Sequence, residues 1–250
     1  WSMAECFGFC PLFDADIGNW DVSGNGNMYQ TFRGTNFNNG GSPSISGWTM
    51  SNTVSLNNMF RDSTSFNQPI GSWDTSNVQS FYFTLYNAVN FDQDISDWVM
   101  SASTNVSYLF GGFSNKAFNN GGSPNISGWT FGPSVTTFKE MFRQTQFNQP
   151  IGVWDVSNIT NFDSMLYACP FNQDLSSWNV GNATIFDSMF MVSDFNNSGS
   201  TLISGWVTSG VTDMNAMFFG TPFNQPIGPW DVSSVEQMNV LFITHHLIKM

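Results

Sequence analysis

Aspartates form the densest group of side chains that could do chemistry in this chain. Asp92, Asp94 and Asp97 lie close together, and Asp174 stands in an equivalent later stretch. Carboxylate oxygens are the ligands that Ca²⁺ prefers, several at a time. The spacing matches neither an EF-hand loop nor a calcium-binding nonapeptide repeat. Two interpretations therefore stay open: a solvated face with turn caps, which the pattern favours, and a calcium site at these four aspartates.

Side chains for acid–base or nucleophilic catalysis are scarce. The two histidines, His245 and His246, are adjacent and lie near the C-terminus. The sequence contains no Ser-His-Asp order, zinc-protease helix motif or glycine-rich phosphate loop. Nothing selects a pair among the 18 acidic residues. We expect no catalytic residues, no cofactor other than a possible calcium ion, and no enzyme activity.

Three cysteines are too few for a disulfide scaffold. The spacing of Cys6 and Cys10 allows one disulfide near the N-terminus. Cys169 is expected to be a small buried residue.

The charge and aromatic content of the chain limit the classes of molecule that it is expected to bind. The chain has 250 residues, with 18 acidic and 6 basic residues and a net charge of −12. This balance argues against nucleic acid, because no basic stripe is present to neutralise phosphates. No apolar run reaches the ~18 residues that a membrane span needs. An aromatic content of 16% argues against disorder and favours protein or glycan partners.

Nine repeat units cover most of the chain. Each begins with Phe followed by Asn or Asp, at 24- to 29-residue spacing: Phe13, Phe37, Phe66, Phe91, Phe118, Phe147, Phe171, Phe195 and Phe223. Each also contains one tryptophan: Trp20, Trp48, Trp73, Trp98, Trp129, Trp154, Trp178, Trp206 and Trp230. The tryptophans could form a sugar-stacking platform, but apolar neighbours on both sides favour a buried ladder.

Two polar positions recur in the units. Asparagine follows the first Phe in most units, as in Asn67, Asn148, Asn172 and Asn224. Stacked amides can bond one another and the backbone of each corner, so we predict a structural ladder. Arg33, Arg61 and Arg143 each follow an aromatic residue at one unit position, which predicts an exposed rim.

The apolar pattern of each unit predicts two elements. Ile151, Trp154 and Val156 have the spacing of a short strand, and the next apolar residues fit a short helix or 3₁₀ turn. One unit cannot bury its apolar side alone, whereas stacked units can. The predicted fold is a leucine-rich-repeat-like solenoid of nine coils, each a short parallel strand plus a short helical or 3₁₀ turn. Its domains are an N-terminal segment or cap (1–12), one solenoid (13–242) and a C-terminal tail (243–250).

The units also form three triplets. The second, fifth and eighth units have a longer corner, and the third, sixth and ninth share Phe-Asn-Gln-Pro-Ile-Gly-x-Trp. Duplication of a three-coil block explains this order most simply. A docking feature at every third coil is the alternative.

The unit resembles the BspA-like repeat of bacterial surface proteins. Two stretches carry the resemblance: Phe66-Asn67-Gln68-Pro69-Ile70-Gly71-Ser72-Trp73-Asp74-Thr75-Ser76-Asn77-Val78, and residues 171–180 with the sequence Phe-Asn-Gln-Asp-Leu-Ser-Ser-Trp-Asn-Val. It covers about residues 13–242 and departs from the family in the Gly-Gly-Ser-Pro corners. The resemblance implies a leucine-rich-repeat-like solenoid, an extracellular or cell-surface location and a role in adhesion, with no catalytic residues to transfer.

The function predicted from these observations is a non-catalytic module that binds protein or glycan at a surface. Solenoids commonly bind through one lateral face. The alternative is a structural subunit of a filament or layer, because neither end of the repeats carries an obvious polar cap and uncapped coils can stack end to end.

Overall fold

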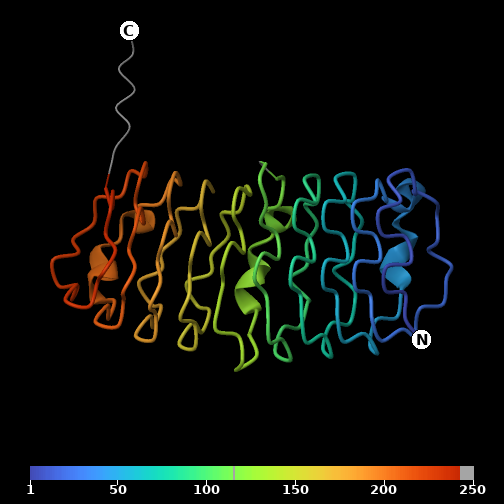
Figure 1. Ribbon diagram of the computed structural model, residues 1–250, viewed down its shortest axis with the longest axis horizontal. Helices are drawn as coiled ribbons and strands as arrows, with labels where there is room; N and C mark the ends of the chain where they lie inside the picture. The colour runs from blue at the N-terminus through green and yellow to red at the C-terminus, as the bar shows by residue number, and fades with distance from the viewer. Residues whose placement is uncertain (115, 243–250) are drawn as a thin grey trace, which may run out of the picture.

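The computed structural model describes residues 1–114 and 116–242, and within them the chain winds as a row of coils. The coils lie side by side along the long axis in the order of the sequence (Figure 1). The predicted C-terminal tail, 243–250, lies outside the described residues, as do His245 and His246. Each coil has two exposed ends, which form two opposite edges of the row.

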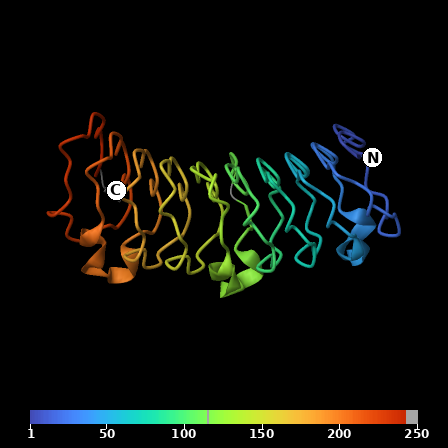
Figure 2. The same ribbon diagram turned by 90° about the horizontal axis from the view of Figure 1, so that it is seen from below.

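One edge, here called the corner edge, carries all the helices of the described residues. They are six short 3₁₀ helices: η1 (Asn39–Gly41), η2 (Pro43–Gly47), η3 (Asn120–Gly122), η4 (Pro124–Gly128), η5 (Asn197–Gly199) and η6 (Thr201–Gly205). They come in pairs in the second, fifth and eighth coils, and the pairs protrude from the row (Figure 2). The triplet order of the sequence is thus visible as a protrusion at every third coil.

The opposite edge, here called the turn edge, consists of tight turns stacked from coil to coil. It comprises residues 3–10, 28–35, 56–63, 81–88, 106–114 with 116, 138–145, 162–169, 186–193 and 214–221. Every second N–H there donates to the next coil, as Glu140 does to the Asp163 carbonyl at 2.9 Å. The alternate N–H groups close turns within the coil, as Met141 does onto Phe138 at 3.1 Å.

This hydrogen bonding differs from the predicted strand and helix. No strand occurs in the described residues, and the coils pair through isolated parallel bridges such as Asn161 with Ile185. Where a strand was predicted, the Trp154 N–H turns back onto the Ile151 carbonyl at 3.0 Å and cannot pair with a neighbouring strand. The segment predicted as a short helix or 3₁₀ turn forms single turns closed by bonds between residues three apart, because every fourth residue, such as Glu140 with φ 51°, is left-handed and reverses the helical path.

The N-terminal segment predicted as a cap extends the row. The N–H groups of Met3, Glu5, Phe7 and Phe9 donate to carbonyls of the first coil at 2.7–3.2 Å, in the pattern of the turn edge. The Phe7 ring stacks on Phe13 with centroids 3.9 Å apart. Residues 3–10 therefore cover one side of the first coil.

Stacked aromatic rings fill the core along the whole row. The first phenylalanines of the nine units form one continuous ladder, with successive centroids 5.7–6.3 Å apart. All of them from Phe37 onward are buried. Apolar burial of this extent is the main favourable contribution to folding.

The tryptophans form a second buried column beside the phenylalanines. Trp206, for example, stacks on Trp230 at 5.8 Å, and its indole N–H donates to the Leu175 carbonyl of the preceding coil at 3.1 Å. Trp20 departs from the predicted ladder, because it is 46% exposed. It lies in the first coil of the described row, where its ring contacts Phe7 at 5.8 Å.

Candidate functional site

The predicted asparagine ladder runs from coil to coil beside the phenylalanine ladder, and its hydrogen bonds are accepted by the side-chain oxygens. Each Oδ1 accepts the N–H of the equivalent residue in the next coil, as Asn148 does from Asn172 at 2.9 Å. The same oxygen accepts Nε2 of Gln173 at 2.9 Å. The asparagine amides therefore bond the backbone and the glutamine side chain of the next corner, and not one another. Because only the oxygen is used, Asp14 and Asp92 fill the same column.

The calcium candidates are engaged in these corner contacts. Asp92 is a rung of the ladder, and its Oδ1 accepts the N–H groups of Asn119 and Gly121 at 2.7 and 2.9 Å. Asp94 and Asp174 each accept the N–H two residues further on, at 2.9 and 2.8 Å. Asp97 is exposed. In residues 1–114 and 116–242, no three His, Cys, Asp or Glu side chains are grouped so as to share a metal ion.

Three further aspartates, Asp74, Asp155 and Asp231, cap turns in the same way, and their pKa values are lowered. The Ser157 side chain and N–H both hydrogen-bond Asp155 and lower its pKa from 3.8. Asp74 and Asp231 have the same two contacts with Ser76 and Ser233, and their pKa values are lowered too. A carboxyl whose pKa is lower in the folded state contributes stability above its unfolded value, and that contribution is lost as pH falls through the folded value.

We therefore expect acid to destabilise the protein below about pH 4 through these caps. The triple variant Asp74→Asn, Asp155→Asn and Asp231→Asn retains acceptors, as Asn179 does naturally for the Gly181 N–H, but it does not titrate. Its melting temperature should fall less between pH 7 and pH 3 than that of the wild type. An equal fall in both proteins would show that these carboxyls carry no pH-dependent stability.

The cysteines are thiols in this structure. Cys6 and Cys10, predicted as a possible disulfide, are both exposed and unbridged. Each closes its own turn, with the Cys6 N–H on Met3 at 3.0 Å and the Cys10 N–H on Phe7 at 3.1 Å. Cys169 is buried, and burial raises its pKa to about 12. Its thiol donates to the Phe147 carbonyl at 2.9 Å, as a hydroxyl would.

The corner edge has two open hollows between its protruding helix pairs. The first, of about 400 Å³, has Pro69 and Gly71 at its floor, with Ser46 of η2 and Asn125 just inside η4 among its lining residues. A Cβ on Gly71 would lie 2.2 Å from the Asp94 carbonyl, so glycine is needed for the coils to approach here.

The second hollow, of about 390 Å³, repeats the first three coils later. Its floor is Pro150 and Gly152, and Ser127 and Val153 also line it. The two hollows have a similar shape but different lining side chains. Val153, which is 78% exposed, stands in the second hollow where Ser72 stands in the first. The two hollows thus offer a ligand different contacts.

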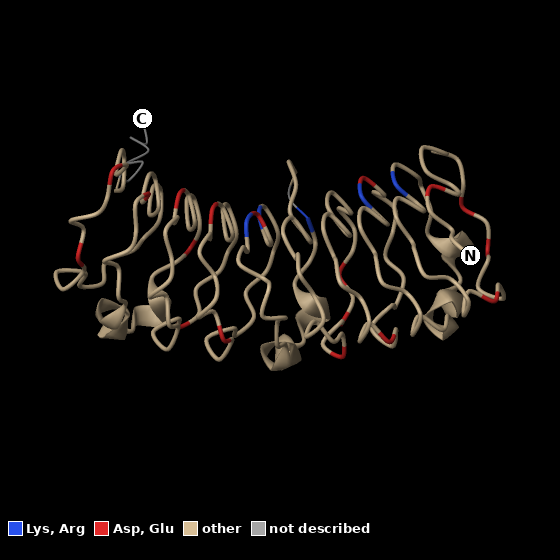
Figure 3. Cartoon of the chain, turned by 60° about the horizontal axis from the view of Figure 1, so that its bottom comes forward, with Lys and Arg blue, Asp and Glu red and all other residues tan. Residues whose placement is uncertain are grey.

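The turn edge gathers the positive charge of the molecule. It forms the concave side of the curved row, and the lysines and arginines lie along it (Figure 3). Five of the chain's six lysines and arginines lie in the described residues, and all five are on this edge: Arg33, Arg61, Lys116, Lys139 and Arg143. Acidic residues, by contrast, are spread over both edges (Figure 3).

Arginines and aromatic rings stack on one another along this edge. The Arg61 guanidinium lies over Phe83 and Tyr86 at 4.4 and 5.4 Å. The Arg143 guanidinium lies over Phe113 and Tyr167 at 5.9 and 4.6 Å. Tyr86 and Phe113 meet edge to face at 5.8 Å, which joins the two groups into one stack. Arg61 and Arg143 of the predicted rim are thus part of an arginine–aromatic stack that spans the second to the sixth coil. Arg33 stacks separately on Phe9, and all three arginines are half-buried where an exposed rim was predicted.

The loop after the fourth coil projects beyond its neighbours on this edge (Figure 3). It carries Phe113, which is 72% exposed. The Phe113 N–H donates to Asn87 Oδ1 at 3.0 Å. Lys116, buried at the base, donates from Nζ to the Ser114 and Gln144 carbonyls, the latter at 3.1 Å, and burial lowers its pKa to about 8.

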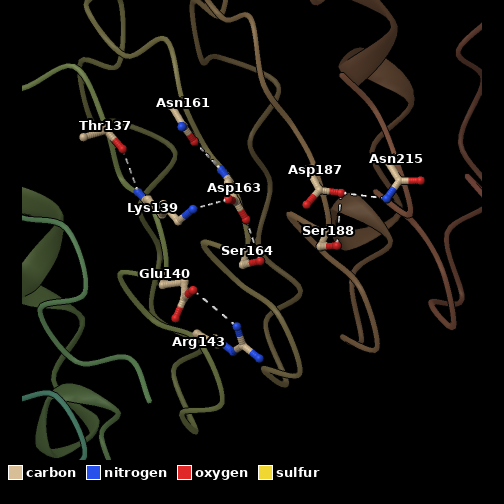
Figure 4. A network of polar contacts seen from close by, with 10 residues as sticks. All are labelled: Thr137, Lys139, Glu140, Arg143, Asn161, Asp163, Ser164, Asp187, Ser188 and Asn215. Carbon is tan, nitrogen blue, oxygen red and sulfur yellow. Dashed lines mark hydrogen bonds and ion pairs between the residues drawn. The ribbon is translucent and has the colours of Figure 1, made fainter. Parts of the chain in front are cut away.

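Ion pairs fix the charged side chains of the fifth and sixth coils (Figure 4). Lys139 Nζ lies 2.6 Å from Asp163 Oδ2, and Arg143 Nη1 lies 3.3 Å from Glu140 Oε1. Burial raises the pKa of Glu140, and the carboxylate of Asp163 adds to this rise. The hydrogen bond with Asp163 raises the pKa of Lys139.

Beyond Arg143 the described part of the turn edge has carboxylates and no cation. Asp187 accepts Nδ2 of Asn215 at 3.0 Å (Figure 4), and burial raises the pKa of Asp187. The cations of the described turn edge are therefore confined to the coils before the seventh.

The shared unit position of the arginines is recognisable in the sequence, whereas Phe113 was not predicted as a functional residue. The available signal was length, because the stretch between Leu109 and Phe118 is longer than its equivalents in the other units. Insertions in a regular repeat map to loops on one face, often the binding face.

Comparison with known proteins gives a family and no function. A family model described as "Mycoplasma protein of unknown function, DUF285" matches residues 1–124, 115–201 and 191–248. No curated protein and no solved structure matches the chain. In the described residues, no helix has the length and hydropathy to cross a membrane. The three consecutive matches indicate a repeat family and together span nearly the whole sequence, so the chain belongs to the family described as Mycoplasma protein of unknown function, DUF285.

Proposed function

We propose that this chain is a non-catalytic module of an extracellular or cell-surface protein, which binds a protein or glycan partner through its turn edge. One observation carries the proposal: the turn edge combines all five described cations with the exposed ring of Phe113, in a chain of net charge −12. Aromatic residues and arginine are enriched where protein surfaces meet. The concave side of a row of repeats is also where such proteins commonly bind.

The amino-acid sequence of the repeat units supports the surface location and the fold class. Their resemblance to BspA-like surface repeats and the stacking of coils with buried Phe and Trp columns favour a leucine-rich-repeat-like solenoid. In this proposal the aspartates of the corner edge have a structural role. Asp94 and Asp174, which line the two hollows, cap the turns of their own coils.

An array experiment tests the proposal. The purified chain is applied to printed arrays of extracellular-matrix proteins, serum proteins and glycans, beside the double variant Arg61→Ala, Arg143→Ala. Signals for bound partners should fall at least about tenfold in the variant, since truncating central interface residues commonly costs more than 1 kcal/mol. Val153→Ser on the corner edge is the matched control and should bind as the wild type does. Loss in the control with retention in the double variant would move the function to the corner edge.

A further inference from the structure

The arginine–aromatic stack and the Phe113 loop together point to the chemistry of the partner. We propose that the turn edge binds an extended acidic segment of a partner protein, with an apolar side chain of that segment packed on Phe113. This inference rests on the proposed function and adds the class of ligand. The apolar contact, the charge and the shape each support it.

The apolar contact is exposed and held in place before any partner arrives. Phe113 is 72% exposed, yet its backbone is fixed by Asn87 and the loop base by Lys116. A Cβ on Gly112 would lie 2.0 Å from Asn87 Oδ1, so the loop needs glycine to reach this position. A preordered aromatic anchor binds with less loss of conformational entropy than a mobile one.

The arginines retain hydrogen-bond donors for carboxylates. Each guanidinium has five N–H donors. Arg61 Nε lies 3.4 Å from Asp62 and its Nη1 donates to Asn58 Oδ1 at 3.2 Å, whereas Arg143 Nη1 lies 3.3 Å from Glu140. Nε is buried in both arginines, so the donors left for a ligand are on the terminal nitrogens. Arg33 has no carboxylate within ion-pair distance among the described residues and stacks on Phe9 at 4.9 Å. Carboxylates of a ligand would form charge-assisted bonds with the free donors.

Charge and shape select an acidic segment over other occupants. The turn-edge segments of the first six coils and residues 3–10 hold five cations, of which Lys116 is buried, against four acids: Glu5, Asp62, Glu140 and Asp163. A polyanion as dense as nucleic acid meets too few cations here, whereas a segment with a few carboxylates needs only a few. A second copy is the poorer occupant, because two concave edges set face to face approach each other mainly at their ends (Figure 3). An extended segment can follow the concave row.

A displayed peptide library tests the inference without a known partner. The full chain is immobilised and panned with phage carrying random dodecapeptides, and enriched sequences are resynthesised with fluorescein for anisotropy titrations. We expect enrichment of Asp and Glu together with Leu, Ile or aromatic residues. Phe113→Ser and Arg61→Ala should each weaken binding about tenfold or more, and Val153→Ser should change it less than twofold. Binding should also weaken as NaCl rises from about 50 to 500 mM.

The outcomes separate this inference from the proposed function. Neutral or basic peptides that lose affinity in Arg61→Ala would overturn the acidic ligand and leave the turn edge as the binding surface. Acidic peptides that are indifferent to Phe113→Ser would overturn the anchor. Peptides indifferent to both variants would overturn both proposals, and circular dichroism of each variant checks that it is folded.

Discussion

Replacing Phe147 with alanine is expected to lower the free energy of unfolding by about 3–5 kcal/mol. The side chain is fully buried, and its ring stacks on Phe118 and Phe171 in the neighbouring coils at 6.2 Å each. It also stacks on Phe142 of the fifth coil at 3.9 Å. Removing the ring leaves a cavity in the middle of the continuous ladder, where neighbouring coils cannot collapse without breaking their backbone contacts.

Urea denaturation followed by tryptophan fluorescence measures this effect. Phe113→Ala is the control, because it removes the same ring from an exposed site and should change stability by less than about 0.5 kcal/mol. A loss below about 1 kcal/mol at Phe147 would contradict the account of the core, since it would mean that the ladder contributes little.

Replacing Asn148 with alanine is expected to cost about 1–3 kcal/mol. Its Oδ1 accepts two donors of the next coil, the Asn172 N–H and Gln173 Nε2, both at 2.9 Å. Alanine leaves these part-buried donors without an acceptor at the corner. The same denaturation experiment measures the loss.

Asn148→Asp distinguishes the ladder from simple packing. Aspartate keeps the oxygen acceptor, as Asp92 does naturally for Asn119 at 2.7 Å, and the variant should retain most of the stability at neutral pH. Equal losses in the alanine and aspartate variants would refute a ladder built on oxygen acceptors.

The repeat period was readable from the sequence because the same positions are buried in every coil. Phenylalanine and tryptophan columns at fixed spacing have a direct physical cause, which is stacking along the row. The same spacing does not distinguish a strand from a tight turn. Ile151, Trp154 and Val156 do turn their side chains inward, but a tight turn places apolar residues at this spacing as readily as a strand does, and the Trp154 N–H closes that turn.

The polar residues show a similar limit. The asparagine column is recognisable from the sequence, but its spacing does not reveal that only the oxygen is used. The sequence therefore leaves Asp92 open between a solvated or turn-capping face and a calcium site, and does not place it in the ladder. Arg61 and Arg143 were recognisable as a rim because they share a unit position. Phe113 lies in an insertion with no equivalent in other units, so periodicity carries no information about it.

Hydrogen–deuterium exchange of the full chain with and without a bound acidic peptide would test most directly whether the turn edge is the binding surface. The backbone N–H groups of residues 107–114 and 139–144 lie beside the arginine–aromatic stack, and those of 39–47, 120–128 and 197–205 lie on the corner edge. We predict slower exchange in the first set upon binding and no change in the second. Protection confined to the corner segments would contradict the account and assign binding to the hollows between the 3₁₀ helices.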